Sequence, residues 1–292
     1  MIQKVISKNK SNSSKAVISS ENIKYLELPE VLYQLIYHHS FRKQFLKNEW
    51  SNLPIKPSDK EHLSHIDTRE LVKMSNQICR ELLYGKEFGK SGLIQYFSNT
   101  FKCLSAYGQN AKFIVQDFME SEAFRDSRDV EFAGQGISLE EAFYLYLSQN
   151  RIFMSATKKN RFWLQHDFLK SLLSLLVINQ EPNFRVLSSL IQQNSVCYYS
   201  LPLYPSSFVS LIHPKLLNKS NDNHKVCFLY AASSDTFVSG PIHEVARDML
   251  ALNDIASIYS EGINLAKKFN ITFNDILYLA KKLTTLGLLK DN

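Results

Sequence analysis

The sequence is poor in glycine, proline and cysteine: its 292 residues include 9 Gly, 8 Pro and 4 Cys. So few glycines and prolines argue against a linker-rich or low-complexity chain, and a 45% share of hydrophobic residues allows a sizeable core. Cys79, Cys103, Cys197 and Cys227 lie far apart and form no C-x-x-C pair. This spacing excludes a cysteine zinc site and is typical of scattered thiols in a reducing compartment.

Long apolar runs are also missing. The closest, over 168–178, is too short to cross a bilayer. The basic, polar N-terminus has no apolar core of signal-peptide length. We therefore expect a soluble, cytoplasmic protein that makes no membrane contact, and we predict that residues 1–23 form a flexible N-terminal tail.

No pattern of catalytic or metal-binding residues is evident. There is no G-x-S-x-G nucleophile motif, and "FAGQGIS" lacks the G-K-[ST] ending of a phosphate-binding loop. His38 and His39 are adjacent, and His62 and His65 fall in a region, 51–67, that we expect to be a loop. We expect that this chain is not an enzyme and holds no metal or cofactor.

The chain changes character near residue 197. Before it, apolar residues recur at helical spacing, Ser138 precedes Glu140 and Glu141 as a helix cap would, and 124–137 lacks a period and predicts a loop. After it, "HKVCFLYAA" and "DTFVSG" favour strands. We predict an α+β protein with an all-helical domain over 24–197 and a second domain over 198–292, made of a three-stranded sheet followed by three helices.

The three C-terminal helices follow from spacing and caps. The first carries an apolar face beginning at Ile242. Ser257 is expected to cap the second helix, which Gly262 weakens by about 1 kcal/mol relative to alanine. Thr272 is expected to cap the third and Gly287 to end it. A small sheet that leads into three short helices is the plan of a winged helix.

The segment 207–289 resembles PqqD-like peptide-recognition domains, which bind the leader peptides of ribosomally made, post-translationally modified natural products. The resemblance is carried by "HKVCFLYAA", "DTFVSG", "IHEVARDMLALND", "LAKKF" and "ILYLAKKLTTLGLL". The sequence departs from the pattern at Ile255, where glycine is usual, and at Gly262, where an apolar residue is expected.

A second resemblance extends from about residue 28 to the C-terminus. "HHSFRKQFLKN", "SEAFRDS", "GISLEEAFYLYL" and "YYSLPLYPSSFVSLIHPKLL" are similar to the MbnC-like partner subunits of multinuclear non-haem iron oxidative enzymes in methanobactin biosynthesis. This resemblance implies a non-catalytic subunit that binds the leader of a precursor peptide and forms a heterodimer with an iron-dependent oxidase. The iron is expected in that partner, which converts a precursor cysteine to an oxazolone and an adjacent thioamide.

The resemblance also implies a site. An extended peptide can add to an exposed strand edge, because such an edge offers unpaired N–H and C=O groups. The edge is expected at Thr236, Phe237, Val238 and Ser239, and the groove floor at Tyr278, Lys281 and Lys282, whose charges suit acidic leader side chains. Aromatic and arginine residues concentrate at interfaces, so we expect the oxidase to contact Phe124, Arg125, Arg128, Tyr198, Tyr199 and Tyr204.

The alternative is a winged-helix DNA-binding regulator. Lys267 and Lys268 on the second C-terminal helix, with Lys281 and Lys282 on the third, are the basic residues that it would use. However, no arginine, the usual reader of guanine, is present over 253–292. We therefore consider nucleic acid the less favoured partner.

Overall fold

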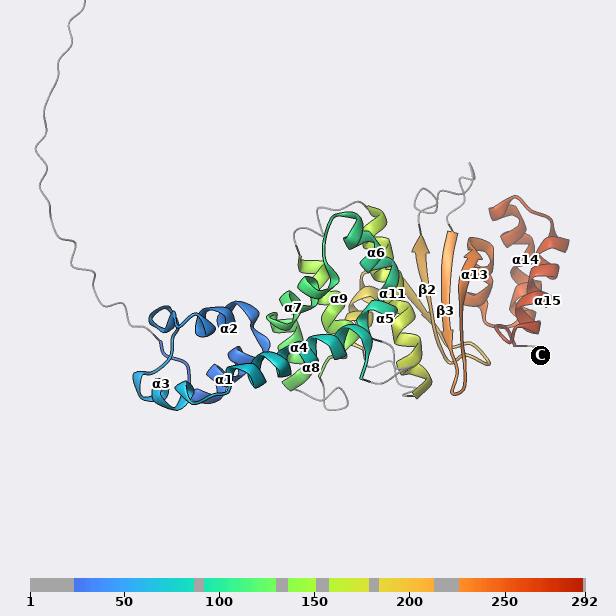
Figure 1. The fold of residues 1–292 in the computed structure, drawn as a ribbon. Coiled ribbons are helices and arrows are strands. Elements are labelled where there is room, and N and C mark those ends of the chain that lie inside the picture. The colour runs from blue at the N-terminus through green and yellow to red at the C-terminus, as the bar shows by residue number, and fades with distance from the viewer. Residues whose placement is uncertain are drawn as a thin grey trace, which may run out of the picture.

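The computed structural model describes residues 24–86, 92–129, 136–150, 158–178, 184–212 and 226–290. These residues form a mixed α+β fold, as predicted, and the elements lie in an elongated row (Figure 1). Helices α1 to α3 are at one end, a larger group of helices is in the middle, and a four-stranded sheet separates that group from three C-terminal helices.

The N-terminal end has a small apolar core of its own, which includes Val31, Leu35 and Phe45. Its elements are α1 (Leu28–Tyr37), α2 (His39–Leu46), the 3-10 helix η1 (Trp50–Asn52) and α3 (Pro57–Ser64). The predicted loop over 51–67 is therefore wrong. Proline has a fixed φ and no N–H, which suits the first position of a helix, so Pro57 begins α3 rather than preventing it.

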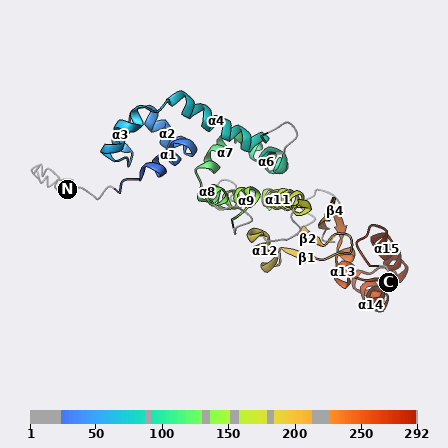
Figure 2. The same cartoon turned by 90° about the horizontal axis from the view of Figure 1, so that it is seen from below.

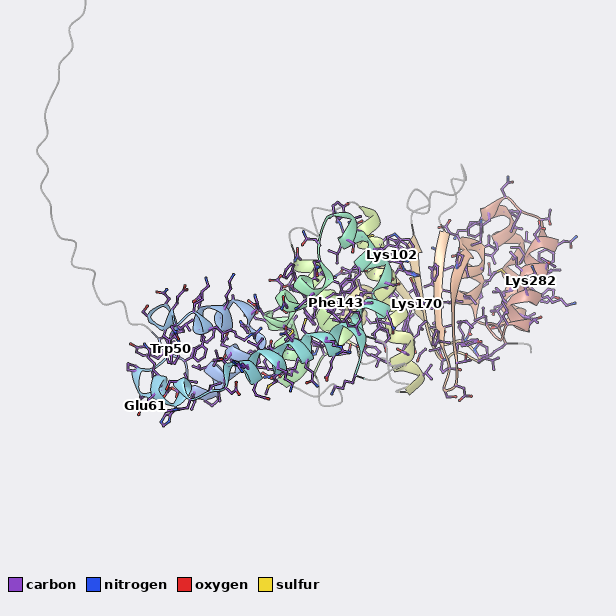
Figure 3. The ribbon with its side chains drawn as sticks, viewed as in Figure 1. Trp50, Glu61, Lys102, Phe143, Lys170 and Lys282 are labelled. Carbon is purple, nitrogen blue, oxygen red and sulfur yellow. The ribbon has the colours of Figure 1, made fainter. Side chains whose placement is uncertain are left out.

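The middle group is built around aromatic side chains, with Phe143 near its centre (Figure 3). Its helices are α4 (Thr68–Tyr84), α5 (Leu93–Tyr96), α6 (Ser98–Ala106), α7 (Ala111–Met119), α8 (Glu122–Asp129), α9 (Leu139–Gln149), α11 (Lys158–Ile178) and α12 (Arg185–Gln192). The predicted loop over 124–137 is wrong in its first part, where α8 continues to Asp129. Phe124 is the one buried residue of α8, so the sequence shows no apolar period there.

The sheet is an antiparallel meander with the strand order β1-β2-β3-β4. Its strands are β1 (Val196–Tyr199), β2 (Ser206–Ile212), β3 (Val226–Ala232) and β4 (Phe237–His243). The prediction of three strands is wrong, because Val196–Tyr199 pairs with β2 as a fourth strand. This pairing is a contact between segments that a Pro-containing loop separates, and local periodicity does not show it.

The two faces of the sheet belong to two different cores. Side chains alternate along a strand, so Phe208 and Tyr230 pack toward α11 while Val209 and Leu229 pack toward the C-terminal helices. Figures 1 and 2 both show the sheet between α11 and α13 (Glu244–Leu252). The domain boundary at 197/198 stays a prediction, and it falls inside β1.

The C-terminal helices α13, α14 (Ile255–Phe269) and α15 (Phe273–Thr285) share one apolar core with the sheet. Thr272 caps α15 as predicted, but Asp254 rather than Ser257 caps α14, by accepting the Ser257 backbone N–H. Ile242, expected in the first of these helices, lies in β4. A Cβ on Gly262 would come within 2.5 Å of the Phe273 ring, so this glycine permits the close approach of α14 and α15.

Candidate functional site

Strand β4 lies at an edge of the sheet, and in the described chain it pairs with β3 alone. Its first residues are unusually exposed for apolar side chains, at 45% for Phe237 and 40% for Val238. Thr236 lies just outside the strand, in the turn that joins β3 to β4. Its backbone is already bonded there, because Ser233 N–H donates to the Thr236 carbonyl and Thr236 N–H donates to the Ser233 hydroxyl.

The register of the β3–β4 ladder determines which backbone groups of β4 point outward. The bond from Ser233 N–H to the Thr236 carbonyl, 2.8 Å long, makes these residues a hydrogen-bonded pair. Bonded and non-bonded pairs alternate in an antiparallel ladder. Val238, which is opposite Ala231, therefore bonds inward to β3, whereas Phe237 and Ser239 direct their N–H and C=O groups to the free edge.

Pro241 supports this assignment. It is opposite Phe228, two residues after Ser239, and therefore also occupies an outward-facing position. Proline has no N–H, so it fits in a strand where that group would not bond to the ladder. The donors that β4 offers to an incoming strand are accordingly concentrated at Phe237 and Ser239.

A small cavity of about 160 Å³ adjoins this end of β4, and its lining combines mainly apolar surface with several polar side chains. We call it the β4 cavity. Four elements form its wall, which comprises Gln95 and Tyr96 of α5, Ser98 and Asn99 of α6, Asp167, Lys170, Ser171 and Ser174 of α11, and Phe237 of β4. It lies on the face of the sheet that α11 covers, opposite the face that carries α13.

Two charged groups with different environments line the β4 cavity. Asp167 is buried, and its carboxylate accepts bonds from Asn99 Nδ2 at 2.8 Å and from the Thr100 backbone N–H and hydroxyl at 2.7 and 2.8 Å. Burial raises the pKa of Asp167. Lys170 is exposed and, among the residues that the structure describes, has no carboxylate within ion-pair distance.

The predicted groove floor and Lys170 lie on opposite sides of the sheet, as the labelled side chains of Lys170 and Lys282 show (Figure 3). Tyr278, Lys281 and Lys282 are all exposed on the outer face of α15, and the Lys282 ammonium is 4.6 Å from the centre of the Tyr278 ring. Helix α15 packs against α14 and α13, while β4 packs against β3, α11 and α13. Strand β4 and helix α15 therefore share α13 as a neighbour.

The predicted oxidase contacts on α8 are largely engaged within the chain. Phe124 is only 5% exposed and belongs to the middle core. Arg125 forms a two-bond ion pair with Glu30 of α1, at 2.8 and 3.1 Å, and the Arg128 guanidinium is 4.3 Å from the centre of the Tyr33 ring. These contacts join α8 to α1, and an interface with another protein at this place stays a prediction.

A largely apolar cavity of about 480 Å³ lies beside this junction. Phe124 and Arg128 line it together with apolar residues of α1, α4, α5 and the start of α9, namely Tyr37, Ile78, Leu82, Leu93, Tyr96 and Leu139. It is the part of this region that could receive an apolar side chain of a partner.

The remaining predicted contacts lie at the opposite edge of the sheet. Tyr198 of β1 is exposed and donates its hydroxyl to the Pro205 carbonyl at 2.9 Å. Tyr199 and Tyr204 are half-buried against the C-terminal core. Helix α8 belongs to the middle group of helices, whereas β1 is the first strand of the sheet. The structure therefore does not gather the six predicted contacts into one patch.

The described residues also bear on metal binding and membrane crossing. Among the described residues, no group of three or more His, Cys, Asp or Glu side chains could hold a metal ion, and none of the four cysteines forms a disulfide there. His62 lies in α3, not in the loop expected from the sequence. In the same part of the chain, we find no helix with the length and apolarity needed to cross a membrane.

No family model, curated protein or solved structure matches the chain. The β4 cavity was missed by sequence reasoning, because its wall combines elements that are distant in the chain. Of the residues that line this cavity, Phe237 is the one that the sequence analysis assigned to a binding site.

Proposed function

We propose that this chain is a non-catalytic partner subunit that binds the leader of a ribosomally made precursor peptide at the free edge of β4. In this proposal, the sheet and α13 to α15 act as a PqqD-like winged helix, and the helical part binds an iron-dependent oxidase of the methanobactin type. That oxidase holds the iron and modifies the precursor's cysteines. The proposal rests on the sequence resemblance together with one structural observation.

The observation is the pair of outward-facing residues Phe237 and Ser239 at the exposed end of β4. Each offers an N–H and a C=O to an extended peptide, which gains affinity from backbone pairing and register from its alternate side chains. The bonding of Thr236 within the turn shortens the predicted edge to Phe237–Ser239.

Two proline substitutions test this edge. Ser239→Pro removes an outward donor and leaves the β3 ladder intact, as Pro241 does naturally, so we expect peptide binding to fall by about tenfold with little change in stability. Val238→Pro removes a bond to β3 instead, and we expect it to lower the unfolding temperature. Circular dichroism and fluorescence anisotropy with a labelled synthetic leader of a methanobactin-type precursor measure the two effects.

The same titration separates a peptide from DNA. We expect leader binding that depends weakly on salt and little on Lys281 and Lys282, because exposed ion pairs contribute about 0–1 kcal/mol. A DNA-binding protein would instead bind a random duplex with steep salt dependence, since each phosphate contact releases counterions. Duplex binding of this kind without leader binding would overturn the proposed function.

A further inference from the structure

We propose that the β4 cavity receives one side chain of the bound peptide and selects an acidic residue at that position through Lys170. This inference rests on the proposed function, since it concerns a peptide paired with β4. It differs from the sequence-based expectation, which placed the acidic contacts on Lys281 and Lys282 of α15.

The cavity lies beside the strand edge to which the peptide would add. A peptide strand on β4 would lie about 4.8 Å beyond it, and residues directly opposite each other have Cβ atoms about 5 Å apart. Phe237 both pairs outward and lines the cavity. The peptide residue opposite Phe237 therefore directs its side chain to the face covered by α11, next to the cavity.

The cavity wall combines apolar surface, polar groups and one cation. Phe237 and Tyr96 supply apolar surface, while Ser98, Ser171 and Asn99 supply hydroxyl and amide groups. Lys170 is the one cation among the lining residues, and it has no counter-ion in the described chain. A carboxylate of Asp or Glu on the peptide would complete this ion pair at a partly enclosed site.

Asp167, the one acidic residue of the wall, does not reverse this preference. Its two oxygens accept three bonds from Asn99 and Thr100, at the N-terminus of α6. The positive end of that helix compensates a carboxylate placed there. Asp167 is thus engaged with α6, whereas Lys170 has no ion-pair partner among the residues that the structure describes.

The experiment uses the full-length chain and a display library of random short peptides. We expect the wild-type chain to enrich peptides with Asp or Glu at one fixed position. Lys170→Gln should lose that enrichment, and Lys170→Glu should replace it with Lys or Arg. An enriched peptide should bind about fivefold more tightly than its Asp→Asn or Glu→Gln counterpart, and this difference should vanish in Lys170→Gln. Lys102→Gln, at an exposed lysine of α6 outside the cavity wall, is the matched control.

The outcomes separate this inference from the proposed function. If peptides are captured in a Ser239-dependent manner but show no acidic position, or keep it in Lys170→Gln, the selection by Lys170 is wrong and edge binding stands. If the library is not captured, or Ser239→Pro leaves capture unchanged, edge binding fails and the inference fails with it. A loss of the acidic preference in Lys102→Gln as well would mean a general charge effect and would also overturn it.

Discussion

His166 and Tyr230 form a buried polar contact where α11 meets the sheet. His166 is 8% exposed, and its Nδ1 is 2.9 Å from the hydroxyl of Tyr230, a residue that is fully buried. Burial lowers the pKa of His166 from 6.5 to about 4, so the ring is neutral in the folded protein at neutral pH. Each side of the contact belongs to a different element, and the pair therefore links helix to strand.

This histidine predicts a loss of stability in acid. The unfolded chain takes up a proton at His166 below its ordinary pKa of 6.5, whereas the folded chain does so only near pH 4. Stability from the neutral ring is therefore complete above pH 6.5 and lost as the pH falls to about 4, by on the order of 3 kcal/mol. Urea unfolding across this range should show a flatter pH profile for His166→Gln. The exposed His39→Gln should keep the wild-type profile, and an unchanged slope in His166→Gln would contradict the assignment.

Gly262 is a second residue whose role depends on its neighbour. Alanine there would improve helix propensity by about 1 kcal/mol. However, its Cβ would lie 2.5 Å from the Phe273 ring, and overpacking of this kind costs about 1–3 kcal/mol. We therefore expect Gly262→Ala to lower the unfolding temperature. Ser260→Ala, at an exposed position of the same helix, should leave it unchanged or raise it slightly. Stabilisation by Gly262→Ala would show that α15 can move away at little cost.

At the scale of elements, two buried carboxylates connect helices. Glu141 of α9 accepts the Ser138 backbone N–H at 3.1 Å within its own capping box and the Val186 N–H of α12 at 2.7 Å. Asp167 of α11 likewise accepts the Thr100 backbone N–H near the N-terminus of α6. Helix N-termini have unpaired N–H groups, so a carboxylate from another helix satisfies them and fixes the position of both helices.

Removing Glu141 should loosen α9 and α12 together. Glu141→Ala leaves buried N–H groups of both helices unpaired, and we expect a loss of about 2–4 kcal/mol in the free energy of unfolding. Glu141→Gln keeps one acceptor oxygen and should lose less. Chemical denaturation measures the difference, and hydrogen exchange should show faster exchange at Val186. Equal losses in the two variants would mean that the side chain contributes only its volume.

At the scale of the whole molecule, the sheet is shared between two cores. Neighbouring residues of β3 face opposite ways, with Tyr230 in the core of the middle helices and Leu229 in the core of the C-terminal helices. In a fragment that begins at residue 198, the face of the sheet that carries Phe208 and Tyr230 would no longer be covered by α11. The apolar surface of Phe208 and Tyr230 would then be exposed to water.

This arrangement predicts that the sheet and the middle helices unfold together. We expect one cooperative transition for residues 92–290 in calorimetry, and a fragment over 198–292 that aggregates or unfolds at a much lower temperature. A fragment that remained soluble and unfolded cooperatively at the temperature of the full chain would instead establish the boundary expected from the sequence.

Features that depend on a few neighbouring residues could be predicted from the sequence. The caps at Ser138 and Thr272 follow from an acidic residue three positions later, and the strand containing Phe237 and Val238 follows from β-favouring residues after a turn. The sequence also indicated the α+β class, because helical spacing dominates until the β-favouring segment begins. In each case the deciding hydrogen bonds or periodicity lie within about one turn or one strand.

How these elements meet could not be predicted from local sequence and follows from the packed structure. That structure placed Val196–Tyr199 beside β2, directed Phe237 and Ser239 outward, and brought Lys170 of α11 next to β4. Each of these results depends on contacts between segments far apart in the chain, and no local pattern encodes the partner of such a contact. The β4 cavity exists for the same reason: its walls acquire their chemistry only when four separate elements pack together.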